Sequence, residues 1–353
     1  MKILIIQQKM IGDVLVSTIL CEHIKKNISD AQVHYLINDH TEAVVHNNPY
    51  IDKIVFFRPH YRTDKLMFFS FLKGIRREKY DVVIDAYGKL ESNLISLFSG
   101  APITISYSKG LSKFIYSHVV PYPKNRDTRL GGSIDKRLKL LSPILSDPID
   151  LTIAPKIYLA KEEIRKAASF LETNGITFSQ SIVMFNVLGS SAQKTYPLPY
   201  MAKIIDAVAQ NTNAVLLFNY IPSQQTIAKE LLAKCAGETQ KRIRFDVFPT
   251  NLRAFLALLH HCNMLVGNEG GAVNMAKAIG LPTFAIFSPF ITKAAWNTFR
   301  DDGHVAVHLN DYLPEKIRQK SRKKLKKESQ ALYRSFKPSF FMDTLAHFID
   351  EYT

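Results

Sequence analysis

The sequence predicts an α/β protein made of two doubly wound domains, each a parallel sheet with helices on both faces. Three observations predict this class. Short, nearly continuous apolar runs recur along the chain, most of them separated by stretches long enough for a helix, as strands buried on both faces require. At 353 residues, the chain is too long for one compact core of ordinary size. The second half repeats the plan of the first.

Five strands are expected in each half. Those of the first half are residues 2–7, 31–37, 53–57, 80–86 and 103–107. Those of the second half are residues 181–187, 214–219, 243–248, 264–267 and 283–288. The domains should meet near residues 155–161, after a Pro-interrupted stretch and before a helical segment that stops at Gly175. We therefore expect an N-terminal domain over 1–158 and a C-terminal domain over 159–335.

Residues 336–353 predict a final helix that docks on a domain. Its apolar side chains Phe341, Leu345, Phe348 and Ile349 share one helical face. We expect this helix to pack back on the N-terminal domain.

Composition and cysteine usage narrow the class further. No apolar stretch approaches the roughly 20 residues that span a membrane, and the first residues lack the order of a signal peptide, so a cytoplasmic protein is expected. Cys21, Cys235 and Cys262 are scattered without a CxxC pair, which argues against a disulfide framework and a structural zinc site. They are expected to be small core residues. No metal or cofactor is predicted.

The net charge of +15 is concentrated near the C-terminus. Residues 315–337 contain ten Lys/Arg and two Glu and so carry +8. Such a run is typical of a solvated face, a nucleic-acid contact or a contact with an anionic membrane surface.

The first stretch with candidate chemistry is "KMIGDVLVST", residues 9–18. It predicts a turn at Gly12 between a buried strand and a helix that Asp13 opens. An Asp at this place is commonly a helix N-cap. The same geometry projects a carboxylate from the strand ends, where ligands of open parallel sheets bind, and the helix N-terminus favours its ionised form.

A second candidate is "MLVGNEGGAVNMAKAIGLP", residues 264–282. It predicts a strand ending at Gly267, a turn and a helix from about Ala272. Gly270 and Gly271 let the backbone approach a ligand closely, and the helix N-terminus suits a phosphate. Glu269 is expected either to bond a ribose hydroxyl or to cap the turn.

The third candidate is the polar loop and helix start of residues 186–205. Ser190, Ser191 and Lys194 follow a predicted strand end, where Lys194 can serve as a point charge on a phosphate. The alternative is an ordinary solvated lysine in a loop.

These segments, in this order and spacing, resemble glycosyltransferase family 9, the heptosyltransferases of bacterial lipopolysaccharide core synthesis. The resemblance covers most of the chain. Beside the residue 9–18 stretch, it rests on a Lys-x-aromatic-Pro motif at Lys194 to Pro197, in which Tyr196 replaces Trp. Its other segments are "NPYIDKIV", "YDVVIDAYGKLESNLIS", "SIDKRLKLL" and "VGNEGGAVNMAKAIGLPTFAIFSPFITKAAW".

The resemblance implies a GT-B fold, with two Rossmann-like domains facing a cleft, and an inverting, metal-independent sugar transfer. The C-terminal domain would bind a nucleotide sugar, usually ADP-heptose, and the N-terminal domain a lipid-linked saccharide acceptor. Asp13 would be the catalytic base, with Gly12 and Arg137 on the acceptor side. The donor side would comprise Ser190, Ser191, Lys194, Glu269, Gly270, Gly271, Ala272 and Asn274.

The chain departs from the family pattern mainly on the donor side. Glu269 stands for Asp, Gly270 for Ser or Thr, and Asn274 for His. A further family His falls on Ser133, and Tyr220 lies where glycines are usual. These departures leave one alternative, a homologue that binds nucleotide without turnover. The concentrated positive charge leaves another, a basic nucleic-acid-binding protein. The transferase is the main prediction, as a peripheral protein at the inner face of the cytoplasmic membrane with no nucleic-acid partner.

Overall fold

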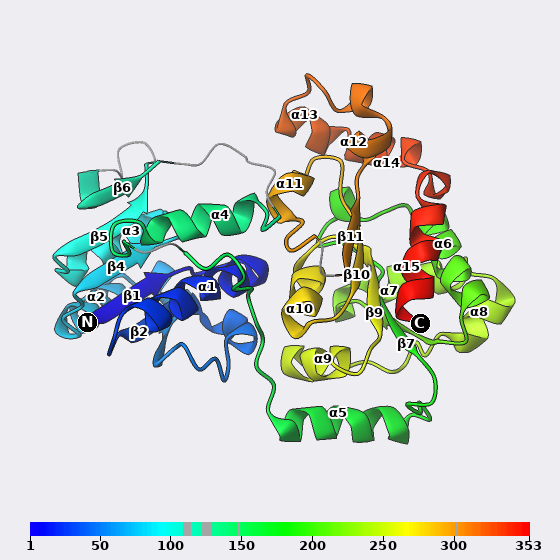
Figure 1. The fold of residues 1–353 in the computed structure, drawn as a ribbon, viewed down its shortest axis with the longest axis horizontal. Helices are drawn as coiled ribbons and strands as arrows, with labels where there is room; N and C mark the ends of the chain where they lie inside the picture. Colours follow the sequence, from blue (N-terminus) through cyan, green and yellow to red (C-terminus); the bar gives the residue numbers. More distant parts are fainter. Residues whose placement is uncertain (109–113, 122–128, 147–148, 301–302) are drawn as a thin grey trace. The chain divides into compact units, whose positions relative to one another are not determined.

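The computed structural model describes residues 1–108, 114–121, 129–146, 149–300 and 303–353. It forms two compact units, Met1–Tyr158 and Leu159–Thr353 (Figure 1). Each unit contains one parallel sheet with helices packed around it, so the predicted α/β class is confirmed. The division between the units lies within the 155–161 segment that the sequence singles out.

The sheet of the first unit has six parallel strands in the order β3-β2-β1-β4-β5-β6. They are β1 (Lys2–Ile6), β2 (Gln32–Asn38), β3 (Lys53–Phe57), β4 (Val82–Asp85), β5 (Ile103–Tyr107) and β6 (His118–Val120). The edge strand β6 is absent from the prediction because its three residues are too short a run to be recognised as a strand. The strand order reverses between β1 and β4, which pair from Ile3 with Val82 to Ile6 with Asp85. Ligands of open parallel sheets bind at such a switch point.

Helices and 3-10 turns connect these strands and follow the last of them. They are α1 (Ile11–Asn27), α2 (Lys65–Arg77), α3 (Leu90–Ser99) and α4 (Gly132–Leu138), with 3-10 turns η1 (Asp39–Val44), η2 (Pro59–Arg62) and η4 (Lys139–Leu141). The helix α1 is buried along nearly its whole length, because it follows the central strand β1 and crosses to β2.

The second unit repeats the plan with five parallel strands in the order β11-β10-β9-β7-β8. They are β7 (Ile182–Asn186), β8 (Val215–Asn219), β9 (Met264–Asn268), β10 (Thr283–Ile286) and β11 (His304–Val307). The prediction of a strand at 243–248 is wrong. Only an isolated bridge from Ile243 to Leu216 forms there. The rings of Phe245 and Phe248 instead pack on the ring of Tyr220, with centroids 5.1 and 4.9 Å from it. The short edge strand β11 was not predicted.

Eleven helices are described in the second unit. The longer ones are α5 (Lys161–Thr173), α6 (Leu198–Asn211), α7 (Gln225–Leu232), α9 (Leu252–Leu259), α10 (Gly271–Ile279) and α15 (Met342–Tyr352). The shorter ones are α8 (Gly237–Arg242), α11 (Lys293–Trp296), α12 (Leu309–Tyr312), α13 (Arg322–Lys327) and α14 (Ser329–Ser335). Helices α9 and α10 cover one face of the sheet, and α6 and α15 cover the other (Figure 1).

The C-terminal helix α15 buries Leu345, Phe348 and Ile349, which confirms its predicted apolar face. The prediction that it returns to the N-terminal domain is wrong, since it packs on α6 and belongs to the second unit. The physical reason is an aromatic contact within the second unit: the ring of Phe348 lies 5.6 Å from that of Phe284 on strand β10.

Candidate functional site

In the first unit, Asp13 lies in the first turn of α1, directly beyond the carboxyl end of β1. It is not the N-cap, because that position is Met10. Gly12 is buried inside the helix and does not make the predicted turn, which residues 7–10 form instead. The Asp13 carboxylate is therefore free of a capping role, and its side chain is 31% exposed.

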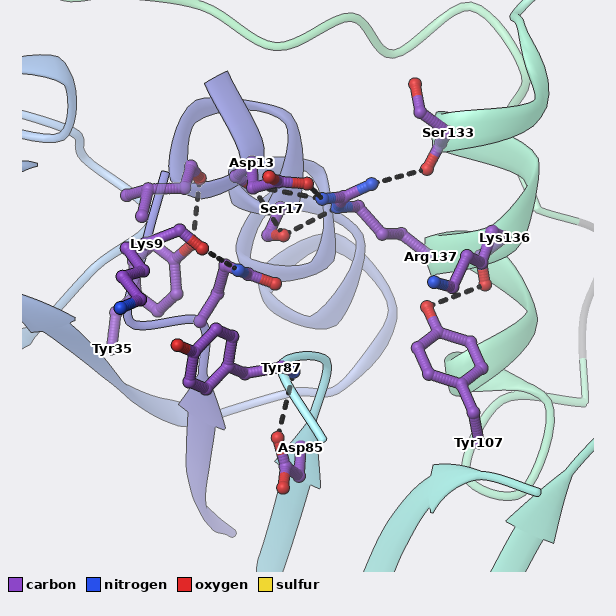
Figure 2. Close-up of polar contacts among 12 residues, drawn as sticks. Lys9, Asp13, Ser17, Tyr35, Asp85, Tyr87, Tyr107, Ser133, Lys136 and Arg137 are labelled. Atoms are coloured by element: carbon purple, nitrogen blue, oxygen red, sulfur yellow. Dashed lines mark hydrogen bonds and ion pairs between the residues drawn. The ribbon is translucent and has the colours of Figure 1, made fainter. Parts of the chain in front are cut away.

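Arg137 holds the Asp13 carboxylate in place (Figure 2). Its Nη2 donates to Asp13 Oδ1 at 2.6 Å, and its Nε donates to Ser17 Oγ at 2.6 Å. The remaining Nη1 donates to the Ser133 carbonyl at 2.7 Å. Because only Oδ1 is engaged, Asp13 Oδ2 has no hydrogen-bond partner among the residues that the structure describes. The site thus combines a fixed carboxylate with one oxygen open to a ligand hydroxyl.

Ser17 completes this arrangement and was missed by the sequence analysis. Its hydroxyl accepts from Arg137 and donates to the Asp13 carbonyl at 2.8 Å. The signal was available, because a residue four positions after Asp13 lies on the same helical face. Ser133, where the family has His, has its own Oγ buried without a partner among the described residues.

Asp85 is a second carboxyl at this edge, at the end of β4 next to β1. It is fully buried, and burial raises its pKa. Its Oδ1 accepts from the backbone N–H groups of Tyr87 (2.9 Å) and Gly88 (2.8 Å), and its Oδ2 accepts from the Tyr116 hydroxyl at 2.6 Å. Asp85 is therefore occupied in shaping the turn that carries Tyr87 (Figure 2).

Tyr87 is the half-buried residue of that turn. Burial raises the pKa of its phenol, and the nearby carboxylates of Glu91, Asp85 and Asp13 add to the rise, partly offset by Arg62. The phenol therefore stays protonated and can donate a hydrogen bond near Asp13.

In the second unit, three asparagines end adjacent strands and join the loops that follow them. Asn219 Nδ2 donates to Asn186 Oδ1 at 2.9 Å, and Asn268 Nδ2 donates to the Asn186 carbonyl at 3.0 Å. Asn268 Oδ1 accepts from the Tyr196 N–H at 2.7 Å. This network fixes the loop of residues 187–196 against the end of β9, at the switch point between β7 and β9.

The same loop brings Lys194 to Glu269. Lys194 Nζ lies 3.0 Å from Glu269 Oε1, and Glu269 is only 7% exposed. Glu269 is therefore neither a turn cap nor exposed, and Lys194 is not an ordinary solvated lysine. Just before this turn, Gly267 lets β9 approach β7 closely, because a Cβ there would meet the Asn186 carbonyl oxygen at 2.4 Å.

The helix α10 begins at Gly271, one residue earlier than predicted, with Gly270 as its N-cap at φ +153°. Gly270 supplies no side-chain cap, so the amides of the first turn remain available to an anion. Ala272 is buried and Asn274 half-buried in that turn. Ser190 and Ser191 are exposed on the facing loop, where Ser191 accepts the Lys194 N–H at 2.9 Å.

The remaining expectations concern metals, cysteines and membrane spans. In the described parts of the chain, no cluster of three or more His, Cys, Asp or Glu is placed to hold a metal ion. All three cysteines are free and buried, as expected of core residues. Within the described residues, no helix combines the length and apolar character that crossing a bilayer demands.

Residues 68–325 match the family model described as glycosyltransferase family 9 (heptosyltransferase). The sequence is 22% identical over 293 residues to lipopolysaccharide heptosyltransferase 1 of Campylobacter coli, covering 81% of this chain and 84% of that protein.

Solved structures show the same fold. The glycosyltransferase family 9 protein of Veillonella parvula superposes with a TM-score of 0.74 at 17% identity, covering 95% of this chain and 97% of that one. The E. coli heptosyltransferase WaaC with ADP superposes with a TM-score of 0.68 at 15% identity, covering 94% and 100%. The predicted GT-B fold is thereby confirmed.

Proposed function

Since the chain belongs to glycosyltransferase family 9 and is a glycosyltransferase, we propose that it transfers a heptose from ADP-heptose to a lipopolysaccharide core or related glycolipid. Two relatives support the choice of substrates. The Campylobacter coli relative is a lipopolysaccharide heptosyltransferase, and E. coli WaaC was solved with ADP. The observation that carries the proposal is the Asp13 carboxylate, held by Arg137 through one oxygen at the switch point of the first sheet.

In the proposed reaction, Asp13 Oδ2 accepts the proton of an acceptor hydroxyl. The hydroxyl oxygen then forms a bond to the anomeric carbon of the donor from the face opposite the diphosphate. The bond from that carbon to the diphosphate oxygen breaks, and the nucleoside diphosphate leaves with the electron pair. One displacement of this kind inverts the anomeric centre. Arg137 and Ser17 act by keeping the carboxylate in position.

The second unit is the proposed donor site. Lys194 and the first-turn amides of α10 after Gly270 provide positive potential for the departing diphosphate. The other residues of the proposed donor site are Ser190 and Ser191 in the loop before Lys194, and Ala272 and Asn274 in the first turn of α10. Glu269 is placed to accept from a sugar or ribose hydroxyl once Lys194 turns to the phosphate. Glu269 is one methylene longer than the Asp of the family pattern, and its carboxylate extends to within 3.0 Å of Lys194 Nζ.

A nucleotide panel and a transfer assay test this proposal. ADP, GDP, UDP and CDP are compared by thermal shift, and ADP is expected to raise the Tm most. A ligand at 100 times its Kd stabilises the fold by about 2.7 kcal/mol. Transfer of heptose from ADP-heptose to a heptose-free lipopolysaccharide core is then followed by mass spectrometry. Binding of ADP without transfer or donor hydrolysis would identify a nucleotide-binding homologue without turnover.

Sugar transfer is expected to persist in EDTA at the same rate as in untreated enzyme. Lys194 and the α10 amides can neutralise the charge that a divalent cation would otherwise neutralise. The measurement is the initial rate with and without chelator. A loss of activity that Mg²⁺ or Mn²⁺ restores would contradict metal independence.

We also propose that the basic run holds the enzyme at the anionic inner face of the cytoplasmic membrane, where a lipid-linked acceptor is presented. The helix α13 supports this, since its only buried side chain is Leu325 and its five cations are all exposed. Each Lys or Arg near an anionic surface contributes about 1 kcal/mol. A run of this size is sufficient for reversible attachment.

Replacing four α13 lysines with Gln is expected to reduce co-sedimentation with anionic vesicles strongly, while transfer to a short soluble acceptor is unchanged. The four are Lys323, Lys324, Lys326 and Lys327. High salt should release the unsubstituted protein in the same way. The matched control makes the same charge change at four exposed lysines elsewhere in the second unit, Lys161, Lys203, Lys229 and Lys234. If both variants sediment with vesicles as the wild type does, α13 is only a solvated face. If the protein instead retards RNA or DNA in a gel-shift assay in a salt-sensitive way, a nucleic acid is the partner of the basic run.

A further inference from the structure

The helix α2 of the first unit leaves large apolar side chains in solvent at its first turns. Leu66 is 82% exposed, Met67 49% and Phe69 48%. We call these three residues the α2 patch. Exposed apolar residues scattered singly are ordinary on protein surfaces, but three within four positions form a contiguous feature.

The core does not require the α2 patch. The helix already buries Leu72 and Ile75, and the rings of Phe68 and Phe71 pack edge-on against Phe57 with centroids 6.0 and 5.9 Å away. The inward face of α2 is therefore complete without the patch. Asp64 caps the helix by accepting the Met67 N–H at 3.0 Å, which holds the first turn, and with it the patch, in a regular helical conformation.

The helix that carries the α2 patch is positively charged. Lys65, Lys73, Arg76 and Arg77 are exposed on the same helix, and Lys73 Nζ lies 4.7 Å from the centre of the Phe69 ring. Of the acidic residues near these turns, Asp64 accepts the Met67 N–H in the cap and Glu91 is paired with Arg62. A helix surface that combines Leu, Met and Phe with Lys and Arg has the composition of an interfacial segment on an anionic bilayer.

The α2 patch lies at the same edge of the first sheet as Asp13. Helices that follow parallel strands begin at the carboxyl edge, so the first turns of α1, α2 and α3 share it. A contact confirms this for α2 and α3: Arg62, just before α2, pairs with Glu91 in the first turn of α3 at 3.0 Å. Leu90 beside Glu91 is 71% exposed and extends the apolar surface along that edge.

We propose that the α2 patch, with Leu90, inserts into the headgroup region of an anionic bilayer and so turns the Asp13 edge of the first unit toward the membrane. This rests on the proposed glycolipid acceptor, whose reacting sugar lies just above such a surface. The mixed composition favours a lipid surface over a second copy of this chain, because two copies would bring like charges together. Apolar insertion also distinguishes this contact from the purely electrostatic one proposed for α13.

A fluorescent reporter tests insertion directly. Leu66→Trp is expected to shift its emission to the blue on vesicles of phosphatidylethanolamine and phosphatidylglycerol, and to be quenched by brominated acyl chains in them. Phe178→Trp, at a 48% exposed position in the second unit, is the matched control and should show neither change. Trp296, the chain's one tryptophan, gives the baseline in the unsubstituted protein. If Leu66→Trp is unaffected by vesicles that sediment the wild type, the proposal is overturned.

A triple variant tests the consequence. Replacing Leu66, Met67 and Phe69 with Ser is expected to lower vesicle affinity by about tenfold and to raise KM for a vesicle-embedded acceptor. The kcat and KM for a short soluble acceptor should stay unchanged, so loss of membrane contact is separated from loss of transfer. The proposal would be overturned if the triple variant bound vesicles as the wild type does. It would also be overturned if the only effect of the substitutions were a change of oligomeric state, measured by light scattering. Absence of transfer in the wild type with every acceptor would instead count against the proposed function.

Discussion

Asp13→Asn is expected to lower the rate of sugar transfer by about 10²–10⁴-fold, the range for loss of a general base. The Asn side chain lacks the carboxylate that accepts the proton, but its amide oxygen can still accept a hydrogen bond from Arg137 Nη2. In the unsubstituted protein this nitrogen lies 2.6 Å from Asp13 Oδ1. Arg137 also keeps its bonds to Ser17 and Ser133. The fold and nucleotide binding should therefore remain near wild type, as measured by thermal unfolding and ADP calorimetry.

The control for this prediction is Ser17→Ala. It removes a partner of Arg137 without touching the carboxylate, so it should affect transfer much less than Asp13→Asn does. If Asp13→Asn keeps a rate near wild type, Asp13 serves only to anchor Arg137, and the base must be sought elsewhere at this edge of the sheet.

Lys194→Ala is expected to weaken ADP binding by about 10–100-fold and adenosine binding much less. A hydrogen bond to a charged group is typically worth about 1.5–3 kcal/mol, which corresponds to that range of affinity. The lysine is placed beside the α10 N-terminus, where a phosphate rather than a base would meet it. Calorimetry with both ligands measures the difference.

The ion pair complicates this variant, because Lys194→Ala leaves the buried Glu269 carboxylate without its cation. Uncompensated buried charge destabilises the fold on its own. The double variant Lys194→Ala with Glu269→Gln removes that charge and is the matched comparison. Recovery of ADP affinity in the double variant, or equal losses for ADP and adenosine, would argue against a phosphate role for Lys194.

The last part of the basic run, residues 329–337, has a structural role beside the loop that carries Lys194. The Gln330 side chain of α14 donates to the Ala192 carbonyl, and the Tyr196 hydroxyl donates to the Phe336 carbonyl. Tyr333, fully buried, packs edge-on against Tyr196 at 5.5 Å. The loop that carries Lys194 is thus supported by residues more than 100 positions later in the chain.

Much of the architecture could be predicted from the residue pattern alone. Nine of the eleven described strands follow apolar runs, because a strand buried on both faces needs apolar residues at every position. The errors in strand assignment also follow from reliance on apolar runs. The strands β6 and β11 lie at sheet edges and are only three and four residues long, too short to stand out as strands. The apolar run 243–248 was misassigned because its aromatic rings pack on Tyr220 and the segment does not pair as a strand.

The candidate residues were also predictable, but their partners were not. Asp13, Arg137, Lys194 and Glu269 were each singled out from the sequence, yet neither pairing was. Arg137 lies 124 positions after Asp13, and Lys194 reaches Glu269 only because β7 and β9 are neighbours in the sheet. The periodicity of the sequence indicates which strand or helix a residue belongs to. Contacts between residues far apart in the chain depend instead on the order of the strands in the sheet and on which side chains lie close enough to pair with a buried charge. The sequence by itself therefore determined which groups are the candidates for the chemistry, and the tertiary structure decided which of them hold one another in place.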